Sequence, residues 1–267
     1  MPAEHLTLTR FLSDERCTDH RCDEDVRTLV IDAALQCRTI AQRVAYGAID
    51  GAPRALSAER PQRRAQGRHV LLFEPFDGAG ADDGTGPAGS VFSLLRSTEL
   101  VGAGYAVYGP ATVLVVSLGA GVHGFTLDPQ RGEFVLTHRG LRIPEAIREV
   151  TIDAAGRGSW EPAVRRYVDE RVAGATATVR WSGSTAARTH RVLTRGGVAV
   201  AGRHVGEDAV AFLVEQAGGR VAHRPAATII GNAAEVERIE RYHRDGVVVP
   251  FASPLYGTRG LFRTATA

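Results

Sequence analysis

Two acidic residues, Glu74 and Asp77, end a short apolar run, Leu71-Leu72-Phe73, and are followed by the small residues Gly78-Ala79-Gly80. Carboxylate oxygens suit Mg²⁺, which often bridges protein carboxylates and a substrate phosphate. Small residues after the acids let backbone N–H groups approach an anion. The stretch is therefore typical of metal-assisted phosphoryl transfer. Two acids at a strand end also occur in plain surface turns, and the stretch alone leaves that alternative open.

The elements around these acids are predicted from hydrophobic periodicity. Apolar residues at helical spacing predict a helix over 24–46, and the run His69–Pro75 predicts a buried strand. The interval 52–69 contains two prolines and many arginines, so we expect an exposed loop there. Strands are predicted near 104–108, 112–118, 122–127 and 133–137. The short turns between them favour an antiparallel meander.

The second half of the chain alternates helical and strand patterns. Helices are predicted in "EPAVRRYVDERVAG", "GSTAARTHRVLTRGG", "GEDAVAFLVEQAGG" and "AAEVERIERYH", with Asn232 as the cap of the last one. Strands are predicted at "VAVAG", after Gly218-Gly219 and at "TIIGN". We therefore expect an α/β protein with two lobes, at 1–145 and 146–267.

Composition excludes several classes of protein. The 267 residues are 44% hydrophobic and 23% charged, which is ordinary for a globular protein. No apolar run has membrane-spanning length and no secretory signal is visible, so we expect a cytoplasmic protein without membrane partners. The net charge of +2 does not indicate nucleic-acid binding, and all of the basic side chains apart from histidine are arginines. Cys17, Cys22 and Cys37 lack metal-ligand spacing.

Beyond these patterns, the chain resembles the class I fructose-1,6-bisphosphatases of proteobacterial type. "LLFEPFDGAG" is similar to their Asp-Pro-Leu-Asp-Gly-Ser-Ser signature, and similar blocks run from "LTLTRFL" to "SPLYGTRGLFR". The resemblance implies a layered αβαβα sandwich, as in inositol monophosphatases. It also implies Mg²⁺-dependent hydrolysis of the 1-phosphate of fructose 1,6-bisphosphate, a step of gluconeogenesis, by a homotetramer.

The resemblance implies particular site residues. Glu74 and Asp77 take the places of two metal-binding, catalytic aspartates, and Gly78, Ala79 and Gly80 follow as the segment whose amides hold phosphate. Glu207, with Asp208 beside it, lies one position from a further metal-binding glutamate.

The implied substrate contacts lie in the second half. Arg180 matches an arginine that holds the second phosphate across a subunit boundary, Asp153 replaces an asparagine at that phosphate, and Arg195 lies near the sugar phosphate. A carboxylate at Asp153 would repel a phosphate there.

The chain also departs from the family. Relatives carry further metal-binding acids before the signature, whereas 52–69 contains a single acid, Glu59. The depleted set favours weak or absent activity over full activity. An alternative is an inactive paralogue that acts as a binding, regulatory or assembly partner. Nucleic-acid binding through "PQRRAQGRH" is disfavoured because no aromatic residues are interleaved with the arginines.

Overall fold

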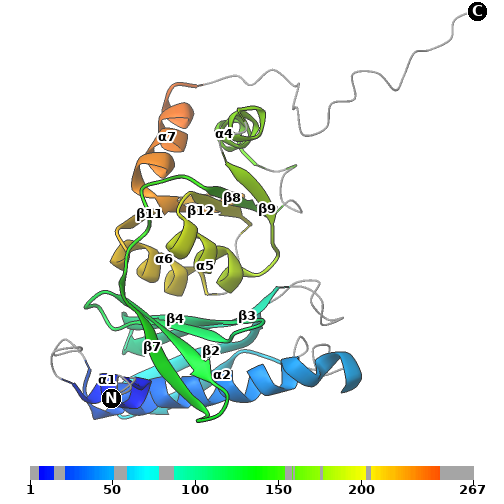
Figure 1. Cartoon of the computed structure of the whole chain (residues 1–267). Coiled ribbons are helices and arrows are strands. Elements are labelled where there is room, and N and C mark those ends of the chain that lie inside the picture. Colours follow the sequence, from blue (N-terminus) through cyan, green and yellow to red (C-terminus); the bar gives the residue numbers. More distant parts are fainter. Residues whose placement is uncertain are drawn as a thin grey trace, which may run out of the picture.

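The structure, a computed structural model, describes residues 6–14, 22–50, 59–77, 87–153, 158, 160–174, 177–202 and 206–246, with 46–50 as backbone only. The helices are α1 Leu8–Ser13, α2 Glu24–Asp50, α4 Pro162–Ala173, α5 Thr185–Arg195, α6 Glu207–Gln216 and α7 Ala233–Arg244. Figure 1 shows five layers, in the order α1 and α2, a first sheet, α5 and α6, a second sheet, and α4 with α7. This is the expected αβαβα sandwich.

The first sheet is an antiparallel meander of seven strands in chain order. Its strands are β1 Gln62–Gln66, β2 His69–Asp77, β3 Ala88–Arg96, β4 Glu99–Tyr108, β5 Val113–Ser117, β6 Val122–Asp128 and β7 Glu133–Leu141. One face packs on α2 through residues such as Phe92 and Leu29, and the other packs on α5 and α6 through residues such as Val91 and Leu213. Both faces are therefore buried, which explains the continuous apolar runs in β3 and β4.

The second sheet is mixed and has the order β11-β12-β10-β8-β9. Its strands are β8 Glu149–Ile152, β9 Thr178–Trp181, β10 Val198–Ala201, β11 Gly219–Arg224 and β12 Ala227–Asn232. β10 is parallel to β8 and antiparallel to β12. Between Leu141, the end of β7, and Glu149, the start of β8, the chain passes from the first sheet to the second, close to the predicted lobe boundary. The division into 1–145 and 146–267 stays a prediction, because α5 contacts strands of both sheets.

Most predicted elements are present. The predicted helix 24–46 is α2, the four predicted meander strands are β4 to β7, and Asn232 does cap α7 by accepting a hydrogen bond from the Ala234 N–H. The expectation of an exposed loop over 52–69 is wrong for 62–66, which forms the edge strand β1. All five residues of β1 are exposed, so the strand has no hydrophobic alternation to read. Gly67, at φ +54°, forms its turn into β2.

The strands β8 and β9 were not predicted. Each has only four residues, and β9 is an exposed edge strand that is held by backbone pairing to β8. Among the described residues, no helix is long and apolar enough to cross a membrane.

Candidate functional site

A β-bulge at the end of β2 brings Glu74 and Asp77 to the same face of the first sheet. Glu74 pairs with Val91 and Asp77 pairs with Gly89, so Pro75 and Phe76 together oppose the single residue Ser90. Residues three apart on a regular strand point to opposite faces, and the extra residue of a bulge reverses that relation. Val91 packs among residues of α5 and α6, so its partner Glu74 faces the same layer. The bulge therefore creates an acid pair at the N-terminus of α5.

Asp77 is held by the first turn of α5. Its Oδ2 accepts hydrogen bonds from the Ser184 hydroxyl at 2.9 Å and from the Ala186 N–H at 2.7 Å. Ser184 is itself the N-cap of α5, since its Oγ accepts from the Ala187 N–H at 3.1 Å. A helix N-terminus attracts negative charge, so the first turn of α5 is a favourable place for this side chain and orients it.

Glu74 is the less satisfied member of the pair. Its Oε2 is buried and has no hydrogen-bond partner in the structure. Burial, and then the negative charge of Asp77, raise the pKa of the Glu74 carboxyl. A buried carboxylate oxygen without a partner is costly unless it binds a cation or a proton. Mg²⁺ is commonly held by one or two carboxylates together with waters and a substrate phosphate, so the pair fits one such ion.

A buried arginine, Arg188, lies beside the acid pair. Its side chain donates to the Ser182 carbonyl at 2.8 Å and to the Thr185 hydroxyl at 3.0 Å, and the residue is 2% exposed. Burial lowers the pKa of its guanidinium, while the charges of Asp77 and Asp153 oppose that decrease. Asp153, which sequence similarity assigns to a phosphate contact, thus lies where Arg188 offsets its negative charge.

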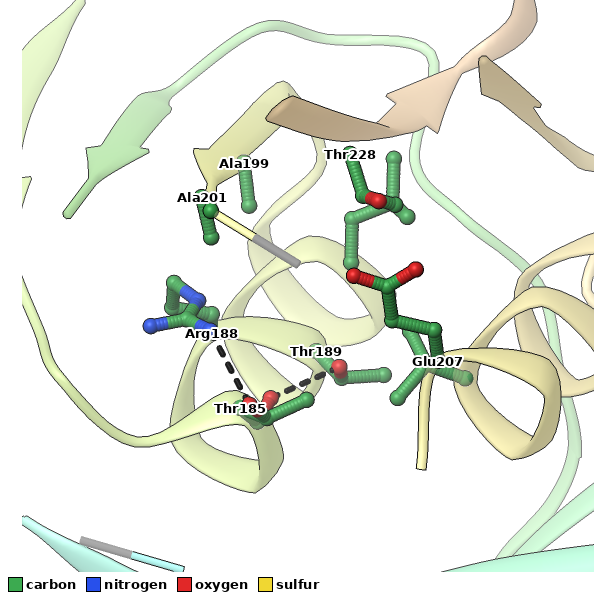
Figure 2. Close-up of a pocket in the computed structure, with 10 residues that line it drawn as sticks. Thr185, Arg188, Thr189, Ala199, Ala201, Glu207 and Thr228 are labelled. Carbon is green, nitrogen blue, oxygen red and sulfur yellow. Dashed lines mark hydrogen bonds between the residues drawn. The ribbon is translucent and has the colours of Figure 1, made fainter. Parts of the chain in front are cut away.

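Glu207 lines a small cavity to which the acid pair does not contribute. It begins α6, and the cavity, of about 20 Å³, is also lined by Thr185, Arg188 and Thr228. Figure 2 shows its carboxylate entering that cavity, with Arg188 across from it. The Glu207 carboxylate is 3.8 Å from the His223 ring. Among the described residues, Glu74, Asp77 and Glu207 do not form a group whose ligand atoms all lie within 4.8 Å.

A larger, basic pocket of about 440 Å³ lies along α5 and β9. Its lining includes Arg180, Trp181, His190, Arg191 and Arg195, so two of the predicted substrate residues meet here. Glu149 is the carboxylate that balances this charge, at 2.7 Å from Arg191 and 3.8 Å from Arg180. Among the described residues that line this pocket and their ion-pair partners, one carboxylate is set against three guanidinium groups, and the surplus of positive charge favours an anionic ligand.

The segment Gly78, Ala79 and Gly80 lies outside the described residues. The described chain resumes at Pro87, and this residue lines the basic pocket. Ser182 and Ala187 also line it, while their neighbours Ser184 and Ala186 bind Asp77. The first turn of α5 therefore connects the acid pair with the basic pocket.

A second cluster of possible metal ligands was not predicted. Asp23, Asp25 and His69 bring ligand atoms within 4.8 Å of one another. They lie at the other end of β2, about 26 Å from Asp77 at a rise of about 3.3 Å per residue. The Arg96 Nε donates to His69 Nε2 at 3.1 Å, so this ring nitrogen is already occupied and a guanidinium group lies beside the cluster. Because Mg²⁺ prefers oxygen ligands, this cluster is a poor candidate for the predicted Mg²⁺ site.

Sequence reasoning missed Ser184, Arg188 and Arg191. A serine directly before a predicted helix is a cap signal and could have identified Ser184. Arg188 lies three residues after Thr185 and four before the buried Val192. This spacing places a charged residue on the buried face of the helix, a pattern that could have identified Arg188. Nothing in the sequence distinguishes Arg191 from the other exposed arginines.

Comparison with known families gives two matches that together span most of the chain. A model described as "Fructose-1-6-bisphosphatase, N-terminal domain" matches residues 54–139. A model described as "Fructose-1-6-bisphosphatase, C-terminal domain" matches residues 143–238.

Individual relatives agree with these matches. The chain is 34% identical to "Fructose-1,6-bisphosphatase class 1 3" of Methylibium petroleiphilum over 353 aligned positions, with 97% of this chain and 98% of the relative covered. It is also 34% identical to a class 1 fructose-1,6-bisphosphatase of Hydrogenophilus thermoluteolus over 351 positions, with the same coverage. Both alignments are longer than the 267 residues of this chain, so the relatives contain segments that are absent here.

Solved structures give the same fold. Leishmania major fructose-1,6-bisphosphatase in its T-state is 25% identical, with a TM-score of 0.72. Its holo form is 24% identical, with a TM-score of 0.75. Both matches cover 90% of this chain and 99% of the solved chain.

Proposed function

Because the chain belongs to the class 1 fructose-1,6-bisphosphatase family, we propose that it binds a sugar bisphosphate and hydrolyses its 1-phosphate only weakly. One observation carries the second part: the described residues offer two carboxylates at the acid pair, and Glu207 does not join them. The proposed substrate is fructose 1,6-bisphosphate or a close relative, which is the substrate class named by the similar proteins.

The geometry supports two separate phosphate sites along α5. The reacting phosphate would lie against the acid pair and the segment that follows it, and the second phosphate would lie in the basic pocket with Arg180, Arg191 and Arg195. Guanidinium groups bind phosphate through paired hydrogen bonds, so three of them can hold and orient one phosphate. Arg188 supplies permanent positive charge near Asp77 and Asp153, which lessens the repulsion of an incoming anion.

Glu74 and Asp77 are the residues that would hold Mg²⁺. When bound, such an ion neutralises charge on the phosphoryl oxygens and activates water. Asp77 is already oriented by α5, whereas the unpartnered Glu74 oxygen is free to bind. Removing a single group that stabilises the transition state typically costs about 10² to 10³ in rate. A site with two carboxylates, lacking the further acids implied by the resemblance, should be slower by at least that factor.

A second candidate function is a non-catalytic binding, regulatory or assembly protein. The observation that favours it is the capping of α5 by Asp77, a structural role that would preserve this residue without any chemistry. Both proposals are compatible with a homotetramer, which the resemblance implies, and with a cytoplasmic location, which the sequence pattern predicts.

The test is phosphate release from fructose 1,6-bisphosphate during a Mg²⁺ titration, with the Rhodospirillum rubrum class 1 relative assayed in parallel. We expect release that depends on Mg²⁺, is at least about 10² slower than that of the relative, and is lost in Glu74→Gln. Glu74→Gln is preferable to a change at Asp77 because it leaves the cap of α5 intact.

Binding of the bisphosphate is measured by calorimetry in the same proteins. Arg195→Gln should weaken it, while Arg131→Gln, on the turn between β6 and β7, should not. Binding without release would support the non-catalytic candidate. Absence of binding would contradict the proposed sugar-bisphosphate function, and turnover within about tenfold of the relative would show that the missing ligands are replaced.

A further inference from the structure

We propose that Ser90, Tyr108 and Cys37 form a buried positioning network that clamps the β2 bulge and thereby aims Glu74 and Asp77 at α5. This inference rests on the proposed function for its consequence, and on the bulge itself for its geometry. None of the three residues would touch metal or substrate.

The network acts at the one place where the β2–β3 ladder is interrupted. The Ser90 hydroxyl donates to the Pro75 carbonyl at 2.6 Å, and Pro75 lies inside the bulge between the two acids. Proline has no N–H to donate to the ladder, which suits it to a bulge. Ser90 thus replaces with its side chain a contact that regular pairing would supply through the backbone.

The directions of the hydrogen bonds follow from valence. Ser90 has one hydroxyl proton, which it gives to Pro75, so the Tyr108 hydroxyl must donate to Ser90 Oγ across 2.5 Å. Cys37 lies in the same core cluster as Tyr108, between α2 and the sheet. Burial raises the pKa of its thiol to about 12, and both the Tyr108 and the Ser90 hydroxyls act on that pKa, which places the thiol beside them.

The network lies on the opposite face of the sheet from the acids. Tyr108 and Cys37 belong to the core that packs α2 against the sheet, whereas Val91 and Gly89, the partners of Glu74 and Asp77, face α5 and α6. Ser90 and Cys37 are fully buried and Tyr108 is 9% exposed. A buried hydrogen-bond network of this kind favours one local geometry, because breaking one of its hydrogen bonds would leave a buried polar group without a partner. We infer that it keeps the bulge in its register, without which the two acids would face opposite layers.

The first arm of the experiment measures Mn²⁺ binding by calorimetry, with and without inorganic phosphate. Ser90→Ala should lower Mn²⁺ affinity by about 10- to 100-fold, the range typical when a residue that orients metal ligands is lost. Tyr108→Phe should cause a smaller loss. Ser117→Ala is the matched control, because Ser117 is equally buried in β5 of the same sheet but lies away from the bulge, and it should leave the affinity unchanged.

The second arm is a double-mutant cycle of unfolding equilibria, which needs no metal. If Ser90 positions Asp77 to cap α5, Ser90→Ala and Asp77→Ala should be non-additive by about fivefold in the unfolding constant, as expected for residues of one network. Ser117→Ala with Asp77→Ala should be additive. If the wild-type protein binds no Mn²⁺, the result counts against the proposed function. The double-mutant cycle then tests the role of Ser90 by itself. An additive cycle for Ser90, or unchanged Mn²⁺ affinity in Ser90→Ala, would overturn the inference.

Discussion

His190 lines the basic pocket but carries no charge at neutral pH. Burial, followed by the positive charges of His138, Arg191 and Arg195, lowers the pKa of His190 to about 4. Its Nδ1 is 3.1 Å from the hydroxyl of Tyr105, whose pKa is raised far above its ordinary value by burial. The two groups therefore share a hydrogen bond between neutral partners. At neutral pH the positive charge of the pocket comes from its arginines.

This lowered pKa predicts a loss of stability in acid. The unfolded chain takes up the proton near the ordinary pKa of 6.5, whereas the folded protein resists it down to about 4. The stability that neutral His190 contributes is thus complete above pH 6.5 and is lost as the pH falls towards 4, by up to about 3 kcal/mol. We expect His190→Gln to flatten the pH dependence of the unfolding free energy, measured in urea at pH 7, 5.5 and 4. Parallel profiles for His190→Gln and wild type would contradict the argument.

The helix α5 carries both halves of the candidate site. Its first turn binds Asp77 through Ser184 and Ala186, and its last two turns present Arg191 and Arg195 to the basic pocket. It lies between the two sheets, as Figure 1 shows. A change at the N-terminus of this one helix should therefore affect stability and the acid pair together.

Substitutions at Ser184 separate ordinary capping from the contact with Asp77. Ser184→Ala should destabilise the protein by about 1 kcal/mol, the usual value of an N-cap. Aspartate is as good an N-cap as serine in general, yet Ser184→Asp should destabilise more than Ser184→Ala here, since it places a second carboxylate against Asp77. Thr7→Asp, at the N-cap of α1, is the control and should change stability by less than about 0.5 kcal/mol. The measurement is urea denaturation at pH 7, and equal stability of Ser184→Asp and wild type would show that Asp77 does not contact the cap.

The distance between the first sheet and α5 depends on the absence of a side chain at Gly89. A Cβ at this position would lie 2.4 Å from both the Ala106 carbonyl oxygen and the Ala186 Cβ. The close approach that glycine permits lets the N-terminus of α5 reach Asp77, the partner of Gly89 in the β2–β3 ladder.

Gly89→Ala should therefore destabilise the whole molecule by about 1 to 3 kcal/mol through overpacking. Adding Ala186→Gly should recover only part of that loss, because the clash with the Ala106 carbonyl remains. Gly109→Ala, where the nearest atom would be 4.0 Å from the new Cβ, should be nearly neutral. The free energy of unfolding is compared by thermal or chemical denaturation. If Gly89→Ala leaves it unchanged, the sheet and α5 can move apart without loss of stability.

Much of the architecture could be predicted because it depends on local patterns. Periodicity located α2 and the meander strands, and a cap signal located the start of α7. β8 and β9 escaped prediction because each is a short strand held by pairing to a strand from another part of the chain. β1 pairs with the adjacent β2 but escaped prediction because all of its residues are exposed and show no alternation. Among the site residues, Glu74 and Asp77 were found from their types and spacing, and Arg180 and Arg195 from resemblance, and the fold brings the last two into one pocket.

The sequence by itself determined that this chain folds as a member of its family and where the acids Glu74 and Asp77 lie along it. Both facts depend on residue types and their order, which the sequence contains in full. Only the tertiary structure decided which groups meet: the bulge that turns Glu74 and Asp77 to one face, the capping of α5 by Asp77, the charge of Arg188 beside Asp153, and the separation of Glu207. The physical reason is that each of these depends on the register between strands or on the packing of one layer against the next, and such contacts join residues far apart in the chain.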